Sequence, residues 1–462
     1  MKKAISRSSI AERLILAAGI LLRLLYVCFS TIYDRQYDIG MISLDAGHTV
    51  SGGHLAYIQY LYENLHLPDV DPSTVYQFHH PPVHHTLCAL WMRFLSLFIH
   101  NNSILEESIQ IVPFVFSIIT LIFMYKILKG FDIEGKPLYF AMTILSFHPA
   151  LILLSGSVNN DGTALAFTVL TIYFFIKWIK DSSWKNIILC ALFLGLGIST
   201  KQNVAYLAFP MALVFIIVLI KTLATGKKMG DATGKDTGNT VGRTIAQYIV
   251  FGAVSIPLGM WFFVRNLIKY NMSLLWVYEL PSDSWQYTGN VPVINRFLWP
   301  DLGEFFDNIT HFKIGCGYNV WMQIMRTSVL GEWDMASQSK AVKIVAVLLM
   351  LAGAALALVA FILCVRFIVR CLINKRWSLT GLFMVCAYLV VMAGYLVFAY
   401  KYPQECSMNF RYITVTLLFG AVGIGVDDIY ENSKKIKSGF STILAGFCIL
   451  TIAMLIIWAG LV

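Results

Sequence analysis

The chain has 462 residues, of which 58% are hydrophobic and 13% are charged. Soluble domains are about 45–50% apolar and about 25% charged, so this composition excludes both an ordinary soluble protein and a disordered one. Lys and Arg outnumber Asp and Glu by 35 to 26, which gives a net charge of +9. We therefore expect a polytopic membrane protein whose positive charge lies in basic loops rather than on a nucleic-acid surface.

Apolar segments long enough to be candidate membrane-spanning helices recur along the chain, since about 20 apolar residues cross a bilayer. The eleven candidates lie at about 14–32, 107–128, 136–157, 162–180, 186–200, 203–221, 244–264, 342–365, 378–399, 412–430 and 439–461. The fifth is short, and the first carries Arg23 in its interior. The predicted fold is an all-α polytopic membrane protein, with residues 1–462 forming a single integral membrane domain.

The loop charges predict an orientation. Basic residues are concentrated at the N-terminus and in every second loop after the first span. Because cytoplasmic loops carry an excess of Lys and Arg, the N-terminus is predicted to be cytoplasmic. The external side then holds two large loops, 33–106 and 266–341, while 222–243 is a cytoplasmic linker rich in Gly, Thr and Lys. Within the first loop, residues 84–99 are too few to span and are predicted to form an interfacial helix.

The first external loop carries carboxylates close to the end of the first span. Asp38 comes soon after that span, and Asp45 follows it. A carboxylate at this position can act as a general base toward an acceptor hydroxyl, and Asp38 is the better placed of the two. Such an Asp can equally cap a short loop helix, and the residues alone leave both interpretations open.

Histidines are also concentrated in this loop, with seven of the ten lying within 48–85. His80 and His84 are four residues apart, but the two prolines between them interrupt any helix. No carboxylate or Cys stands at metal-like spacing, so we expect hydrogen bonds to a sugar or phosphate rather than a metal site. The nine cysteines include no CxxC pair, and a disulfide between Cys316 and Cys406 stays open.

Cations stand at the external ends of several spans, where the positive-inside rule disfavours them. They are Lys201, Arg265, Arg326 and Arg411. Each can snorkel to the interface, but four of them on one face favour binding of a lipid phosphate. Asp161 lies on the same side, in a turn between the third and fourth spans, where it is either a functional acid or part of an ordinary polar turn.

Two further stretches, 327–333 with Glu332 and 402–412, mix aromatic and charged residues at external loop ends. Sugar sites have this composition, and so do interfacial anchors, because Trp and Tyr favour that depth.

In these motifs the chain resembles the GT-C superfamily of polytopic glycosyltransferases, which use polyprenyl-phosphate-linked sugars. It is most similar to the protein O-mannosyltransferase-like branch of bacterial membranes, which includes the aminoarabinose lipid A transferase. The similarity extends from residue 14 to about 430. The motifs that carry it are Tyr37-Asp38-Ile39-Gly40, His80-Pro81-Pro82, Asn159-Asn160-Asp161-Gly162, Ser199-Thr200-Lys201 and Arg265-Asn266.

The resemblance implies an enzyme that transfers a hexosyl or pentosyl group from a polyprenyl-phosphate donor to an acceptor hydroxyl with inversion. The acceptor would be a glycan, lipid or protein on the extracytoplasmic face of the bacterial plasma membrane, with no nucleic acid involved. The Asp-Glu pair of the protein-mannosylating members is missing from the first loop, which weakens the expectation of a protein acceptor and leaves the choice between Asp38 and Asp45 open. No cofactor is required, and a divalent metal is not predicted.

The resemblance also assigns roles to individual residues. The catalytic candidates are Asp38, Asp45 and Asp161. The donor-phosphate candidates are Lys201, Arg265, Arg326 and Arg411. The substrate-binding candidates are His48, His80, His84, Tyr57 and Glu332.

Two other functions are compatible with the composition. A lipid or polysaccharide transporter would place charges near the bilayer midplane, and Arg23 is such a charge. A non-catalytic membrane scaffold gives no reason for acids, histidines and cations to gather on one face.

Overall fold

The structure is a computed structural model that describes residues 7–34, 37–38, 52–225, 240–274, 276–299, 317–333, 335, 337–374, 378–426 and 434–460. Over these residues the chain forms α- and 3-10 helices and loops, with no β-strand. This confirms the predicted all-α class.

Seven helices of the described chain are long and apolar enough to cross a membrane. They are α4–α5 (Asn102–Gly130), α8 (Asp161–Asp181), η5–α10 (Gln202–Thr225), α11 (Thr240–Tyr270), α15 (Lys340–Ile373), α16 (Leu379–Lys401) and α19 (Lys434–Trp458). Two bent pairs raise the number to nine if each pair is one span: α6 (Gly135–Phe147) with α7–η4 (Pro149–Gly156), and η6–η7 (Glu405–Ile413) with α17 (Thr416–Val426). The protein is therefore a multi-pass membrane protein.

The two other predicted spans are helical as well but fall outside that set. The helix α1 (Arg7–Cys28) carries Glu12, Arg13 and Arg23, and α9 (Trp184–Ile198) has only 15 residues. A helix thus lies at each predicted position, but charge in one case and length in the other leave the count of eleven spans unconfirmed.

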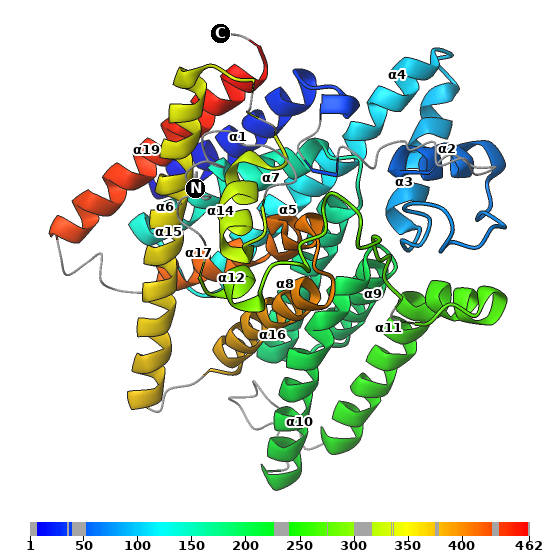
Figure 1. Cartoon of the computed structure of the whole chain (residues 1–462). Coiled ribbons are helices and arrows are strands. Elements are labelled where there is room, and N and C mark those ends of the chain that lie inside the picture. The colour runs from blue at the N-terminus through cyan, green and yellow to red at the C-terminus, as the bar shows by residue number, and fades with distance from the viewer. Residues whose placement is uncertain are drawn as a thin grey trace.

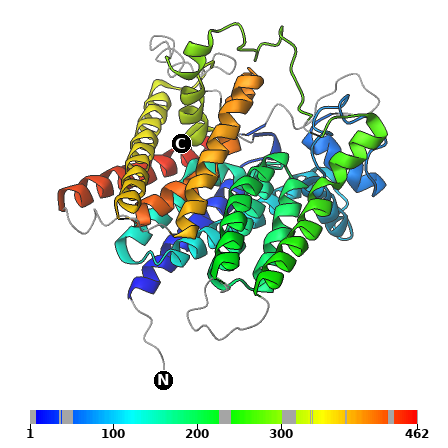
Figure 2. The same ribbon diagram turned by 90° about the horizontal axis from the view of Figure 1, so that it is seen from below.

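The first large loop is partly helical. Its helices α2 (His54–Asn64) and α3 (Val83–Ser96) pack against each other at one side of the molecule, and α15 and α19 pack together at the opposite side (Figures 1 and 2). The helix α3 has 14 residues and is not among those long enough to span, which agrees with the short helix predicted there. The second large loop contributes α12 (Val293–Phe297) and α14 (Val320–Leu330).

The helix α8 forms the centre of the bundle and packs on α5 (Ile111–Gly130) and α9. In its apolar window 83% of the residues are buried, against 22–44% in the other six long spans of the described chain. A helix that is apolar on all sides lies either among other helices or against lipid, and the burial of α8 shows that it lies among other helices. The first residue of α8, Asp161, is consequently held inside the molecule.

The break between α6 and α7 exposes backbone carbonyls. Pro149 has no N–H, so the carbonyl of Leu145 loses its helical partner. The N–H of Ala150 donates to His148 Nδ1 at 3.3 Å, and Ser146 O therefore also lacks its usual partner. The two helices meet at 50°.

Arg23 of α1 binds these carbonyls, and this explains a charge inside a predicted span. Its guanidinium donates to Ser146 O at 3.0 Å, to Leu145 O at 3.2 Å and to Ser117 Oγ at 2.8 Å. Gly19 allows the close approach, since a Cβ there would lie 2.8 Å from Ser146 Cβ. Arg23 thus caps the broken helix and is 1% exposed.

Candidate active site

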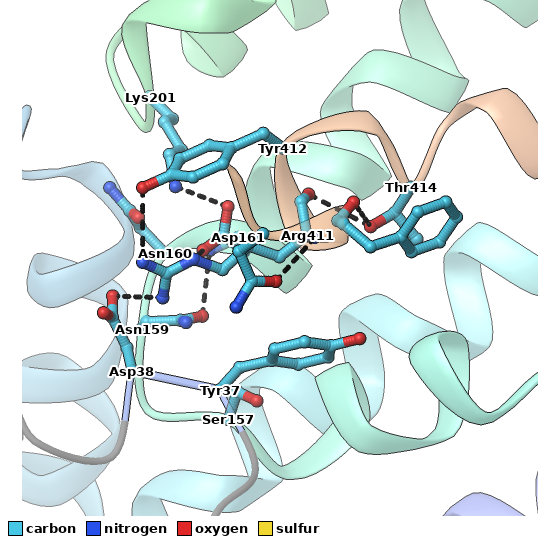
Figure 3. Close-up of polar contacts among 12 residues, drawn as sticks. Tyr37, Asp38, Ser157, Asn159, Asn160, Asp161, Lys201, Arg411, Tyr412 and Thr414 are labelled. Atoms are coloured by element: carbon cyan, nitrogen blue, oxygen red, sulfur yellow. Dashed lines mark hydrogen bonds and ion pairs between the residues drawn. The ribbon is translucent and has the colours of Figure 1, made fainter. Parts of the chain in front are cut away.

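Charged side chains from distant parts of the sequence meet in a buried group, which we call the ion cluster (Figure 3). Its members are Asp38 of the first loop, Asp161 at the start of α8, Lys201 after α9, Glu332 after α14 and Arg411 in η7. All five were singled out in the sequence as catalytic, phosphate-binding or substrate-binding candidates. Folding brings them together although Asp38 and Arg411 are more than 370 positions apart.

Arg411 lies at the centre of the ion cluster. Its NH1 lies 2.6 Å from Asp38 Oδ2 and 4.0 Å from Glu332 Oε1, and its Nε lies 3.8 Å from Asp161 Oδ2. Lys201 Nζ pairs with Asp161 Oδ1 from the other side. The side chain of Arg411 is only 4% exposed, so these pairs are formed away from bulk water.

Asp38 is held in place through its backbone and its neighbour. Its φ of 58° falls in the left-handed region, which Asp tolerates better than most residues. Its N–H donates to Glu332 Oε2 at 2.9 Å, and the preceding Tyr37 donates its hydroxyl to Thr327 O at 2.6 Å. Asn409 in turn donates to Glu332 Oε1 at 2.8 Å. Glu332 therefore positions Asp38 and links it to the segment that carries Arg411.

The Asn-Asn-Asp-Gly turn positions Asp161. Asn159 Oδ1 accepts from the Asp161 N–H at 3.2 Å, and Asn160 Nδ2 donates to Thr200 O at 2.7 Å. The second bond ties the turn to the residue before Lys201. A carboxylate in the first turn of a helix is also favoured by the helix dipole. At Gly162 a Cβ would lie 3.0 Å from Leu154 O, which explains a glycine at that position.

The charges of the ion cluster nearly cancel, with three carboxylates against two cations. Burial raises the pKa of Asp38, but the charge of Arg411 and the hydrogen bond with His54 outweigh it and hold that pKa well below its usual range. Asp38 is therefore an ionised but weak base while Arg411 contacts it. An additional anion can bind here only if a cation changes its partner.

A chain of histidines continues from Asp38 into the first loop. His54 Nε2 lies 3.3 Å from Asp38 Oδ2, and His54 Nδ1 lies 2.9 Å from His85 Nε2. The ring of the predicted site residue His80 stacks on His54 with centroids 5.4 Å apart. Burial lowers the pKa of both His80 and His85 well below the usual range, so both rings are neutral at physiological pH.

His54 and His85 were not selected from the sequence. The one signal for them was the histidine-rich loop. Their contact depends on how α2 packs on α3, which spacing along the chain does not reveal.

Four other predicted site residues lie outside the ion cluster. His84 is fully buried in α3, with Nδ1 2.8 Å from Thr163 Oγ1 and Nε2 2.8 Å from Val158 O, so it ties α3 to the start of α8. Tyr57 is buried and stacks on His85 at 4.5 Å.

The other two are cations. Arg265 donates to Pro68 O at 2.9 Å and lines a small cavity with Tyr57. Arg326 pairs with Glu405, NH1 to Oε1, at 3.7 Å. The structure thus brings two of the four predicted phosphate ligands together and leaves these two apart from them.

Three positions named in the sequence, Asp45, His48 and Cys316, lie outside the described residues. Among the residues that the structure does describe, no group of three or more His, Cys, Asp or Glu could hold a metal ion. The carboxylates of the ion cluster are instead paired with Lys, Arg, His or amide groups.

Comparison with known proteins gives one match in sequence. Residues 79–230 match the model of the dolichyl-phosphate-mannose-protein mannosyltransferase family. The chain resembles these membrane glycosyltransferases. The resemblance predicted from the sequence is thereby confirmed over about a third of the chain, a segment that contains Asp161 and Lys201 but not Asp38 or Arg411. No curated protein matches the sequence.

Solved structures give weaker likenesses. The Archaeoglobus fulgidus oligosaccharyltransferase in complex with Zn and sulfate aligns with a TM-score of 0.48 and 11% identity, over 95% of this chain and 53% of that one. ArnT from Cupriavidus metallidurans aligns with a TM-score of 0.43 and 14% identity, over 98% of this chain and 77% of that one. The chain spans about half the length of the archaeal enzyme.

Proposed function

We propose that this protein is a glycosyltransferase that moves a sugar from a polyprenyl-phosphate donor to an acceptor hydroxyl, with inversion at the anomeric carbon. The observation that carries the proposal is the buried contact of Arg411 with Asp38, beside the Lys201–Asp161 pair. This contact supports roles for Asp38 as the general base and for Arg411 and Lys201 as the cations that bind the donor phosphate. The match of residues 79–230 to mannosyltransferases supports the same chemistry.

The near-neutral charge of the ion cluster gives the proposed reaction an order. The donor phosphate takes Arg411 and Lys201 as partners, and Arg411 moves away from Asp38. Asp38 then becomes a stronger base and removes the proton of the acceptor hydroxyl. The acceptor oxygen bonds to the anomeric carbon as the bond to the phosphate oxygen breaks, and the leaving phosphate keeps the electron pair beside the two cations.

Other features belong to the same proposal. The site faces the extracytoplasmic side of a bacterial plasma membrane, with the N-terminus in the cytoplasm, as the loop charges suggest. We propose that transfer needs no divalent metal, since the carboxylates of the ion cluster already have cationic or amide partners. Asp45 is the second candidate base, His48, His80, His84 and Tyr57 remain candidate contacts of the sugar or acceptor, and Arg265 and Arg326 are candidate contacts along the donor path.

The test uses purified protein in detergent with a panel of radiolabelled polyprenyl-phosphate sugars that includes mannose. The substitution Asp38→Asn removes the base but keeps the size of the side chain. We expect turnover to fall by about 10²–10⁴-fold, the usual contribution of a general base. EDTA should leave the wild-type rate unchanged.

A matched control is available on the same chain. Asp132 is an exposed residue outside the ion cluster that also has a φ of 58°. Asp132→Asn therefore makes the same substitution in the same left-handed backbone conformation. It should keep full activity. Wild-type turnover by Asp38→Asn, measured in a protein with unchanged melting temperature, would falsify the assignment of the base.

The charge of Arg23 inside a predicted span was the one feature that favoured a transporter. Arg23 instead caps α6, so this feature no longer favours that alternative. Sugar transfer by protein in detergent, where no membrane potential or compartment exists, distinguishes the enzyme from a transporter.

A further inference from the structure

A cleft of about 450 Å³ opens between the loop after α11 and the end of α16. Trp276, Tyr278 and Tyr402 line it, together with Glu279 and Lys401. Its volume lies in the range of small-ligand sites, about 300–1,000 Å³. None of these residues belongs to the ion cluster, although Tyr402 begins the stretch 402–412 whose composition fits a sugar site.

A chain of ring contacts connects this aromatic cleft to Asp38. Trp276 meets His79 with ring centroids 5.3 Å apart, and His79 meets His80 at 4.2 Å. His80 stacks on His54, whose Nε2 contacts Asp38. The rings of His79, His80 and His54 therefore connect the cleft to the proposed base, Asp38.

A second path leads from the cleft to the cations. Tyr402 contacts Phe398 at 5.2 Å, and Phe398 contacts Tyr412 at 5.2 Å. Lys201 Nζ lies 4.7 Å from the centre of the Tyr412 ring. Two separate chains of contacts, each running through several side chains, thus connect the aromatic cleft with the ion cluster.

The side chains of the aromatic cleft indicate the class of ligand. Trp276 and Tyr278 line the cleft and are partly exposed, so part of each ring can contact the C–H face of a pyranose. Glu279 and Lys401 are exposed and can accept and donate hydrogen bonds to hydroxyl groups. One anion beside one cation gives no net charge, which favours a neutral polyhydroxylated ligand over a phosphate or another polyanion.

We propose that the aromatic cleft binds a neutral saccharide, the carbohydrate part of the acceptor, and presents its terminal hydroxyl to Asp38. This inference rests on the proposed function, because it names the acceptor class of the same site. It assigns the acceptor to glycans or glycolipids and away from unmodified protein.

The experiment measures saccharide binding without any donor. The full-length protein in lipid nanodiscs is titrated with neutral linear hexasaccharides, one mannan and one β-glucan, and binding is followed by saturation-transfer NMR. We expect at least one of them to bind. Trp276→Ala and Tyr278→Ala should each raise its Kd by about tenfold or more, as truncation of a central aromatic contact does.

Two further variants separate ring stacking from damage to the fold. Trp276→Phe keeps a ring face and should retain most of the affinity. Trp285→Ala removes a 63% exposed tryptophan of the same loop that does not line the cleft, and it should bind like the wild type.

The inference is overturned if neither hexasaccharide binds, if both alanine variants bind as the wild type does, or if a neutral hexapeptide competes for the site with higher affinity. Turnover with polyprenyl-phosphate donors is measured on the same samples. Saccharide binding without turnover contradicts the proposed function and leaves the cleft assignment standing. Turnover without saccharide binding supports the proposed function and overturns the assignment of the cleft.

Discussion

At the scale of single residues, Arg411 is notable because it contacts carboxylates from three separate segments, those of Asp38, Asp161 and Glu332. A planar guanidinium can serve several oxygens at fixed angles, whereas an ammonium acts as a point charge. In the proposed reaction, Arg411 holds Asp38 before the donor binds and contacts the donor phosphate afterwards. The sequence indicated a candidate phosphate ligand at this position but not its contact with Asp38.

We expect Arg411→Lys to lower turnover by about 10²-fold or more, the usual effect of losing one charge-stabilising donor in a reaction centre. The shorter reach of the ammonium toward several oxygens is the reason. Steady-state rates and donor Kd, measured together, check this. Arg93→Lys, at a surface arginine of α3 that donates to backbone carbonyls, is the control and should have no effect. Equal rates for Arg411→Lys and wild type would contradict the central role of the guanidinium.

At the scale of elements, the broken span α6–α7 depends on a side chain from another helix. Arg23 satisfies carbonyls that the break between α6 and α7 leaves without helical partners, and Arg23 also donates to the buried Ser117 hydroxyl. An unsatisfied buried polar group costs about 1–3 kcal/mol. Several buried hydrogen bonds of this part of the bundle therefore depend on the single side chain of Arg23.

Arg23→Met keeps a long flexible side chain but removes every donor. We expect the free energy of unfolding to fall by about 2–4 kcal/mol, because several carbonyls lose their partner at once. Thermal unfolding of purified protein, followed by a thiol-reactive dye, gives the measurement. Leu24→Met, at the neighbouring exposed position, should leave the melting temperature nearly unchanged. The expectation fails if the two variants unfold at the same temperature.

At the scale of the whole molecule, the sequence predicted the positions of the helices well, because long apolar segments leave few alternatives in a membrane. It also predicted the five members of the ion cluster, since charges at the ends of spans are costly without a function or a partner. The separation of Arg265 and Arg326 from that cluster could not be predicted. Whether a cation joins the ion cluster depends on which helix ends meet in space, and a single sequence does not contain that information.

The buried histidines of the first loop make the stability of the protein depend on pH. Burial lowers the pKa of His84 to about 3, below its value of about 6.5 in an unfolded chain, and burial lowers the pKa of His85 in the same direction. Between these values the unfolded state binds more protons than the folded state, so stability falls as the pH decreases from about 6.5 toward 3.

Each such histidine contributes at most about 1.4 kcal/mol per pH unit in that window. We expect the melting temperature to be level from pH 8 to 7 and to drop steadily below pH 6. His84→Gln should flatten the acid slope although it lowers stability at pH 7.5, whereas His66→Gln, at an exposed histidine, should not change the slope. An identical acid slope for His84→Gln and the wild type would contradict this origin.

The pairing of Asp38 with Arg411 also has a consequence for how the protein is made. The ribosome adds Asp38 early and Arg411 only after most of the spanning helices, so a nascent chain carries the acid long before its partner exists. Until then Asp38 lacks the charge that holds its pKa low. Assembly of this centre is therefore among the last events of biogenesis, and a chain interrupted before residue 411 can insert many of its helices and still have no working site.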